Sequence, residues 1–260
     1  MTRLSWLLAL PLLVACGPSA PAPSSPVANL AGSAPASSGS AASVRRAAPY
    51  TGPAGTCQLD GLAMPLYTTE DPHWGDPLAP VAIVIFSDFE CPFCARQKLV
   101  LDDIKAHYGP TRLQLVWKNM PLMRHRRARP AAEAGQAVLE VGGADAFWKF
   151  HDLVFANNHE ITPENLSLWA REAGVDASAY EQARARPSVA AHVNGDLALA
   201  RLLGVNGTPM MIVNGIALEG LQDPNELTTL IDQLLAAAPT PAGFYACDRM
   251  RESWAPAAAK

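Results

Sequence analysis

The sequence predicts an α/β protein in which a mixed central sheet is flanked by helices and carries an inserted helical domain. Three observations indicate this. The apolar run Val81–Phe86 is typical of a strand buried on both faces. Helical signals then dominate between about residues 124 and 204. Extended signals return from Pro209 to Leu218. We therefore expect a single domain over about residues 56–260 with an insertion over about 124–204.

The first part of the domain is expected to form a strand, a helix and a second strand. Apolar residues recur at helical spacing after Val81–Phe86, which predicts a helix from about Pro92 to His107. Apolar and polar residues alternate over Arg112–Lys118, which predicts the next strand.

The inserted domain is expected to consist of several helices. Their sequence signals are helical spacing, residues suited to N-caps such as Thr162 and Asp176, and glycines at the ends such as Gly204. The expected stretches are Ala131–Val141, Ala144–Ala156, a helix after Thr162 that ends near Gly174, a short helix from Asp176 to Ala185, and Ser188–Leu203.

The last part of the domain is expected to be a hairpin and a helix. Pro209–Val213 and Ile216–Leu218 flank Asn214-Gly215, a pair that favours a tight hairpin turn. A final helix is expected from about Pro224 to Ala238.

Two cysteines lie where the first strand becomes the first helix, in the order Cys91-Pro92-Phe93-Cys94. With Cys91 near the N-cap and Pro92 at the first helical position, unpaired N–H groups of the first turn can point at the Cys91 sulfur. The positive end of the helix favours a thiolate there, so the pKa of Cys91 should fall below the usual value of about 8.5. The spacing therefore indicates disulfide exchange.

The N-terminus reads as an export signal over residues 1–15, because its apolar stretch is too short to span a bilayer. Residues 13–16 resemble the lipobox of bacterial lipoproteins, which implies that Cys16 carries lipid and anchors the chain to a membrane. A plain secretory signal is the alternative. Gly17 favours the outer over the inner membrane. We expect a location in the cell envelope, on its periplasmic side. Residues 16–55 are rich in Pro, Ala and Ser and are expected to form a disordered linker.

The other cysteines are Cys57 and Cys247, near the two ends of the domain. Once Cys16 is assigned to lipid and the C-x-x-C pair to exchange, we expect these two to form a structural disulfide. Two unrelated cysteines are the alternative.

Charge gives little information about partners. The net charge is −4 over 260 residues, so nothing indicates nucleic acid. The basic cluster Arg124–Arg129 is the local exception, and it fits either solvated surface or a role in steering substrate or stabilising a thiolate.

Several motifs together resemble disulfide-bond oxidoreductases of the DsbA type. They are Phe86–Cys94, Trp117–Leu122 with nearby His125, Ala144–Asn157, Gly207-Thr208-Pro209 and Asn214-Gly215. The resemblance covers about Gly75 to Ala238 and implies a thioredoxin fold.

This resemblance implies a site and a mechanism. Thr208-Pro209 would be a cis peptide facing the cysteines and would bind an extended substrate. Cys91, at the helix end with the more exposed sulfur, would form a mixed disulfide, and Cys94 would resolve it. The implied partners are extended proteins that contain thiols or disulfides, and a redox partner. No cofactor or metal is expected.

The sequence departs from that family in two places. Phe93 stands where the strongest oxidants have His, so the Cys91 thiolate should be less stabilised, and the direction of electron flow stays open. Ile85 stands where related sequences often have a buried Glu that relays protons. Asp88 and Glu90 are the nearest acids.

The alternative functions are metal binding, peptide binding without catalysis, and disulfide isomerisation. The sequence does not offer the four ligands of a zinc site, because His151 and His159 lie in a different helical region from the cysteines. A copper-delivery protein would need a pattern of Met and His around the cysteines, which the sequence does not have. Met210-Met211 are instead expected to pack in the sheet. A thioredoxin-like module that binds peptides without catalysis also fits the sequence. An isomerase usually needs a dimerisation region, so we expect a monomer.

Overall fold

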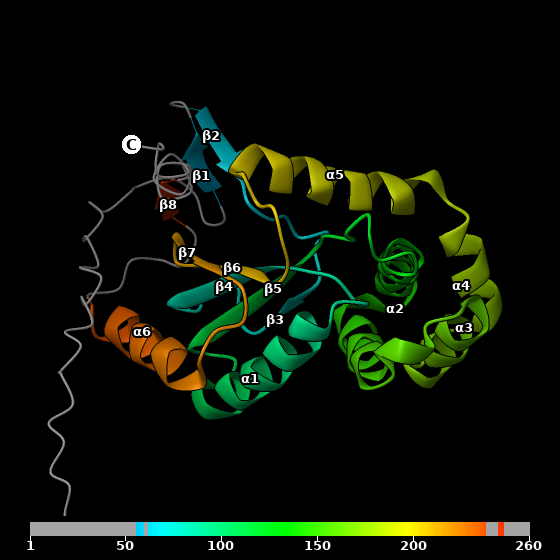
Figure 1. The fold of residues 1–260 in the computed structure, drawn as a ribbon, viewed down its shortest axis with the longest axis horizontal. Helices are drawn as coiled ribbons and strands as arrows, with labels where there is room; N and C mark the ends of the chain where they lie inside the picture. The colour runs from blue at the N-terminus through cyan, green and yellow to red at the C-terminus, as the bar shows by residue number, and fades with distance from the viewer. Residues whose placement is uncertain (1–55, 60–61, 238–243, 247–260) are drawn as a thin grey trace, which may run out of the picture. The chain divides into compact units, whose positions relative to one another are not determined.

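The computed structural model describes residues 56–59, 62–237 and 244–246. Its main sheet has five strands in the order β3-β5-β4-β6-β7 (Figure 1). The central pair β4 and β5 is parallel, and the other neighbours are antiparallel. The strands of this sheet are β3 (His73–Trp74), β4 (Val81–Ser87), β5 (Leu113–Asn119), β6 (Met210–Val213) and β7 (Ile216–Glu219).

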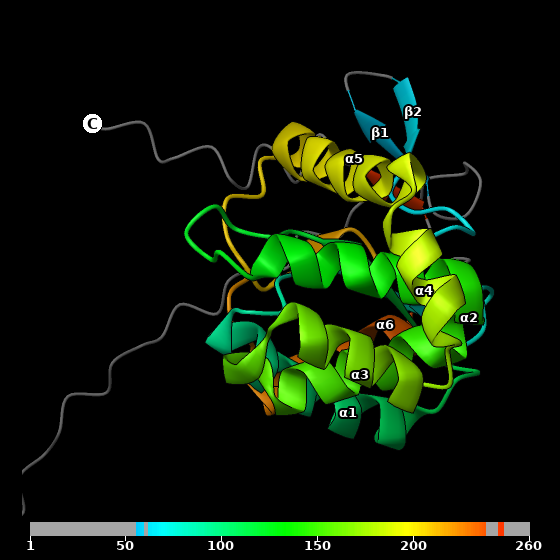
Figure 2. The ribbon, with the colours of Figure 1, turned by 90° about the vertical axis from the view of Figure 1, so that its right-hand side faces the viewer.

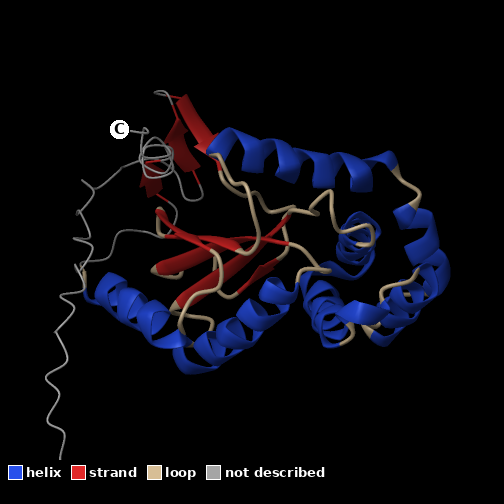
Figure 3. Ribbon diagram, viewed as in Figure 1, coloured by secondary structure: helices blue, strands red, loops and turns tan. Residues whose placement is uncertain are grey.

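Helices lie on both sides of this sheet, which confirms the predicted fold class (Figure 3). Between β5 and β6 the chain forms four α-helices and a short 3-10 helix. The helices are α1 (Pro92–Tyr108), α2 (Ala128–Ala156), η1 (Asn158–Glu160), α3 (Pro163–Glu172), α4 (Ala177–Arg184), α5 (Pro187–Leu203) and α6 (Pro224–Ala236).

Strand β4 is buried on both faces, as its continuous apolar sequence predicts. Val81, Ile83 and Ile85 contribute to the core cluster that also contains residues of α1, α2 and α6. Val84 and Phe86 point to the opposite face and belong to the cluster that contains residues of α5. This double burial fixes the end of β4, where the cysteine pair begins.

The inserted helices pack around α2, which contacts α3, α4 and α5 (Figure 2). Helix α2 is kinked at Gly143, whose φ of 72° and ψ of −171° are not helical, so the two expected helical stretches meet there. The predicted caps are confirmed: Thr162 accepts a hydrogen bond from the backbone N–H of Asn165, and Asp176 accepts one from Ala179.

Strand β5 is buried on both faces, although its alternating sequence predicts one apolar and one exposed polar face. Its polar side chains are buried as well as its apolar ones. Gln114 accepts a hydrogen bond from the Tyr67 hydroxyl at 2.9 Å. Lys118 forms ion pairs with Asp71 and Asp196. Helices cover both faces of the sheet, so each polar side chain needs a buried partner.

A second sheet, which has no clear signal in the sequence, contains three strands in the order β2-β1-β8. Its strands are β1 (Thr56–Leu59), β2 (Leu62–Pro65) and β8 (Phe244–Ala246). The backbone of Cys57 is paired with that of Tyr245, two residues before Cys247. Cys247 itself, Cys16, the predicted signal over residues 1–15 and the linker over residues 16–55 lie outside the described residues.

Candidate active site

The cysteine pair lies at the start of α1, directly after the end of β4. Cys91 is the N-cap residue with extended backbone angles, and Pro92 occupies the first turn. The backbone N–H of Cys91 donates to the carbonyl of Asp88 at 3.1 Å, and the Asp88 carboxylate accepts from the backbone N–H of Glu90 at 2.8 Å. This tight turn places the Cys91 sulfur at the positive end of the helix.

Thr208 and Pro209 face Cys91 from the segment before β6. The peptide bond between them is cis, as the resemblance implies. The Cys91 sulfur lies 3.6 Å from the Thr208 carbonyl oxygen. A groove of about 440 Å³ is lined by Gly207, Thr208, Pro209 and Glu219, among others. The structure therefore brings the Cys91-Cys94 pair next to Thr208 and Pro209, and the Thr208-Pro209 segment in turn lines a groove.

The two thiols, which are free, differ sharply in acidity. Hydrogen bonding from Cys94 lowers the pKa of Cys91 to about 5, against the effect of burial, and Thr208 and the backbone N–H groups of Cys94 and Phe93 contribute to the decrease. Burial, followed by the hydrogen bond and charge of Cys91, raises the pKa of Cys94. At neutral pH the first sulfur is a thiolate and the second a thiol.

One expectation about this pair is wrong. Cys91 was expected to have the more exposed sulfur, but both cysteines are only 1% exposed. Cys91 contacts the turn after β4 through its backbone N–H and the Thr208 carbonyl through its sulfur. What distinguishes the two cysteines is therefore their hydrogen bonding, and only Cys91 has its sulfur against the Thr208 carbonyl.

Phe93 projects outward and is 50% exposed. The guanidinium carbon of Arg96 lies 4.5 Å from the centroid of its ring. Phe93 cannot supply the positive charge of a histidine, but this cation–π contact holds a positive charge one turn into the same helix.

Asp88 and Glu90 are partners of the basic cluster. The Asp88 carboxylate lies 2.7 Å from Nδ1 of His125 and accepts the backbone N–H of Leu122 at 2.9 Å. Glu90 accepts the backbone N–H and Nε–H of Arg127 at 2.7 and 3.2 Å. These carboxylates fasten the loop before α2 to the cysteine turn.

A small cavity of about 10 Å³ lies beside Cys94. Ile85, Ser87, Cys94, Lys98 and His151 are among its lining residues. By sequence, His151 belongs to a different helical region from the cysteines, whereas the fold brings its side chain to the same cavity as Cys94. The sequence signal for a role of His151 was its place in the motif Phe147-Trp148 and His151-Asp152, within the expected helix Ala144–Ala156.

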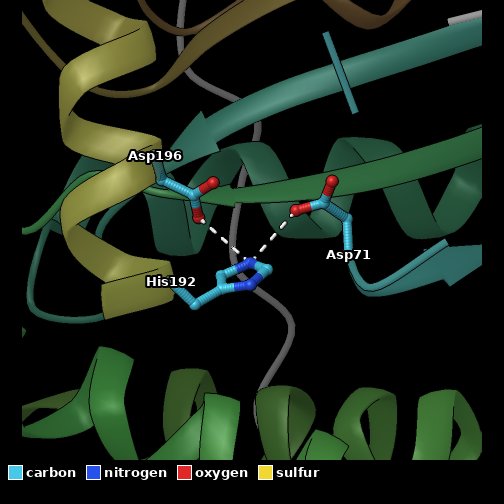
Figure 4. A group of neighbouring side chains, drawn as sticks. All are labelled: Asp71, His192 and Asp196. Carbon is cyan, nitrogen blue, oxygen red and sulfur yellow. Dashed lines mark hydrogen bonds and ion pairs between the residues drawn. The ribbon is translucent and has the colours of Figure 1, made fainter. Parts of the chain in front are cut away.

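A second polar cluster lies between β5 and α5, where Asp71, His192 and Asp196 converge (Figure 4). Nε2 of His192 lies 3.1 Å from Asp71 and 3.8 Å from Asp196. Lys118 places its ammonium 2.6 Å from Asp71 and 3.1 Å from Asp196. Because this ammonium already neutralises the carboxylates, we interpret the cluster as an ion network that joins the sheet to the insert.

The two methionines after Pro209 are structural. Met210 and Met211 are 2% and 0% exposed in β6, so the expectation that they pack in the sheet is confirmed. No helix in the described ranges is long and apolar enough to cross a membrane.

Comparisons with known proteins reveal relatives by sequence. The chain is 32% identical over 178 residues to a Na(+)/H(+) antiporter NhaA 3 of Salinispora tropica, a match that covers 68% of this chain and 26% of that protein. It is 33% identical to a Na(+)/H(+) antiporter NhaA 1 of Mycolicibacterium gilvum, with 66% of this chain and 28% of that protein covered. The chain thus spans about a quarter of the length of these relatives. Most of each antiporter sequence lies outside the matched region.

Solved structures resemble the chain along most of their own length. A thioredoxin-like oxidoreductase from Silicibacter pomeroyi DSS-3 has a TM-score of 0.58 and 27% identity, covering 66% of this chain and 95% of that one. BdbD from Bacillus subtilis, in its oxidised form, has a TM-score of 0.59 and 23% identity, covering 64% and 93%.

The described fold, the position of the cysteine pair and a family profile lead to one conclusion. The profile is described as thioredoxin and matches residues 67–233, which include the strand before the cysteines, the insert and the cis proline. The chain belongs to the thioredoxin family.

Proposed function

We propose that the protein is a thiol-disulfide oxidoreductase that exchanges disulfides through the pair Cys91 and Cys94. The observation that carries this proposal is the placement of Cys91 at the start of α1, with its sulfur 3.6 Å from the Thr208 carbonyl oxygen and next to the cis Thr208-Pro209 bond. The opposite displacement of the two thiol pKa values supports it. A low-pKa thiolate is a nucleophile at neutral pH, and a neighbouring protonated thiol is suited to resolve the intermediate.

The exchange proceeds in two steps. The Cys91 thiolate attacks one sulfur of a substrate disulfide; a bond forms between Cys91 and the substrate, and the other substrate sulfur leaves as a thiolate. Cys94 then loses its proton and attacks the Cys91 sulfur. The mixed disulfide breaks, the substrate leaves reduced, and Cys91 and Cys94 are joined by a disulfide. The reverse sequence oxidises a dithiol substrate.

The surroundings of Cys91 suit an extended protein segment as substrate. Phe93 and Met123 are exposed apolar side chains, and Met123 lies in the loop that Asp88 and Glu90 hold against the cysteine turn. Arg124 and Arg126 in the same loop are exposed and basic. A surface of this kind can bind the apolar and acidic residues of an unfolded protein, whereas a small thiol would use little of it.

The N-terminal sequence supports a place of action in the cell envelope. We propose that residues 1–15 direct export, that Cys16 carries a lipid anchor, and that residues 16–55 link it to the domain. The protein would act on exported proteins in the cell envelope, on its periplasmic side, as a monomer. An unidentified redox partner would regenerate the Cys91–Cys94 pair.

The experiment that tests the function is covalent trapping. The Cys94→Ser variant retains the Cys91 thiolate but cannot resolve a mixed disulfide, so it should accumulate substrate proteins linked to Cys91 that reductant releases. Cys91→Ser is the matched control and should trap none. Trapping by Cys91→Ser alone would reverse the roles of the two cysteines.

A companion assay separates catalysis from binding. Reduction of insulin by dithiothreitol should be faster in the presence of the protein and should fall to the uncatalysed rate with Cys91→Ser. A module that only binds peptides would give the same rate with and without this substitution.

A further inference from the structure

The cavity beside Cys94 is lined by a buried histidine, His151, which has no role in the two exchange steps described above. Cys94, Ser87, Lys98 and His151 line this space of about 10 Å³. That volume is close to the space needed by one water molecule, which requires polar partners such as these. Because Cys94 and His151 line the same space, a single water there has both side chains as neighbours.

His151 is held so that one ring nitrogen is a proton acceptor. Its Nδ1 lies 3.0 Å from the carboxylate of Asp152, an acceptor, so Nδ1 carries the proton and Nε2 has the lone pair. Asp152 is fixed in turn by Lys98 at 3.2 Å, and Lys98 is paired with Asp102 at 2.6 Å. A histidine oriented by a carboxylate is the arrangement of a general base.

Aromatic rings surround His151 and keep its neighbourhood apolar. The ring centroid of His151 lies 5.0 Å from that of Trp117, 4.9 Å from Trp148 and 4.9 Å from Phe155. Burial lowers the pKa of His151, Asp152 raises it, and Lys98 and Lys105 on α1 lower it. The ring is therefore neutral at physiological pH and able to take up a proton.

The other polar groups near Cys94 are engaged elsewhere or keep their protons. Asp102 lines the same cavity but is paired with Lys98 at 2.6 Å, and Ser87 offers only a hydroxyl, which is a far weaker base than an imidazole. Ile85 is apolar and lines the cavity. Asp88 and Glu90 hold His125 and Arg127. The pKa of Lys98 is raised in spite of burial, because Asp102 and Asp152 stabilise its charge, so it remains protonated.

We propose that His151 accepts the proton of Cys94 through a water in this cavity when Cys94 resolves the mixed disulfide, with Asp152 as a positioning residue. The proposal rests on the proposed function and specifies its second step. The thiol proton passes to the water as the water passes one to Nε2. The Cys94 thiolate attacks the Cys91 sulfur, and the substrate thiolate leaves. In the reverse step His151 returns the proton.

A two-phase reaction of the reduced full chain with Ellman's disulfide measures each step separately. Cys91 attacks first and releases one coloured thiolate. Cys94 then attacks the Cys91 adduct and releases the second. A variant with both Cys91→Ser and Cys94→Ser gives the background from the remaining cysteines. The first phase tests the proposed function, and the second tests the role of His151.

The variants His151→Gln and His151→Phe both remove the base, and His151→Phe retains an aromatic ring in the aromatic pocket. At pH 7 the second phase should slow by about a hundredfold, the lower end of the range for general-base catalysis, with the first phase unchanged. The wild-type rate should fall as pH decreases through the pKa of His151. The variant rate should instead rise toward alkaline pH, where hydroxide removes the thiol proton directly.

The matched control is His107→Gln, which removes an exposed histidine from α1 and should leave both phases unchanged. A second phase with wild-type rate and pH profile in both His151 variants would overturn the proposal while leaving the function intact. A slow first phase in the wild-type chain, at the rate of an ordinary thiol, would instead overturn the proposed function.

Discussion

Cys91 and Cys94 are one helical turn apart, yet their thiols have opposite acid–base character. The N-cap position gives Cys91 hydrogen bonds from Cys94 and from backbone N–H groups, whereas Cys94 is buried beside the negative charge that this creates. Each thiol therefore depends on the other, and a change at one should alter the pKa of its partner.

The variant Cys94→Ala should raise the pKa of Cys91, because the hydrogen bond from Cys94 is the largest cause of its decrease. Ultraviolet absorbance of the thiolate across a pH series measures this directly. Ala95→Ser, a change at the adjacent position of α1, should leave the midpoint in place. An unchanged midpoint in Cys94→Ala would show that the helix end alone acidifies Cys91.

The reduction potential of the pair should lie between those of thioredoxin and the strongest periplasmic oxidants. The pKa of Cys91 is about 5, which lies between the pKa of about 7 for the reactive cysteine of thioredoxin and about 3.5 for that of the strongest periplasmic oxidants. A more stable thiolate makes the disulfide more oxidising. Equilibration with glutathione should give a value between about −270 and −120 mV. A value outside this interval would contradict the link between acidity and potential.

The residues of the site differ in how far the sequence could predict them. Cys91, Cys94, Thr208 and Pro209 were found because each belongs to a short motif. His151 was missed as a neighbour of Cys94, since only the packing of α2 against α1 brings them together. The partners of Asp88 and Glu90 were missed for the same reason.

Among the elements, β5 and α5 are joined by a buried ion network that extends to the segment before β3. Asp196 on α5 accepts the backbone N–H and the side-chain amide of Asn119 at 2.8 and 3.0 Å, in addition to Lys118. All four ionic groups, Asp71, Lys118, His192 and Asp196, thus have partners in the folded chain.

The variant Asp196→Ala should destabilise the fold by about 3–5 kcal/mol, because it leaves the Lys118 charge and the Asn119 groups short of a buried partner. Urea unfolding measures the loss. Asp145→Asn, at an exposed position of α2, should change stability by less than about 0.5 kcal/mol. Equal, small effects of both substitutions would mean that the network contributes nothing to stability.

Elements with local signals were predicted well. The caps Thr162 and Asp176 and the turn Asn214-Gly215 depend on residues within a few positions, and the structure contains all three. The sheet of β1, β2 and β8 was missed, because its strands are short and two of them are almost 190 residues apart in the sequence, with pairing set by the folded chain.

For the whole molecule, the order of strands and helices was sufficient to predict a thioredoxin fold with a helical insert, and the family match and the structure confirm it. The order could not predict how the insert is attached. The ion network supplies one attachment, and we expect its histidine to make the stability of the chain depend on pH.

His192 should stabilise the folded chain more at low pH than at high pH. Burial opposes protonation, but the hydrogen bond to Asp71 and the charge of Asp196 raise its pKa above the unfolded value of about 6.5. Its contribution is therefore fully present below that value and is lost as pH rises through the folded-state pKa. The difference in unfolding free energy between wild type and His192→Asn should be larger at pH 6 than at pH 9. A difference independent of pH would contradict this.

The measurement that tests the central claim most directly is the rate of alkylation of Cys91 by iodoacetamide as a function of pH, followed by mass spectrometry of the Cys91 peptide. We predict that the rate reaches half its maximum near pH 5, because the thiolate forms there. A half-maximum near pH 8.5, the value of an ordinary thiol, would contradict the account.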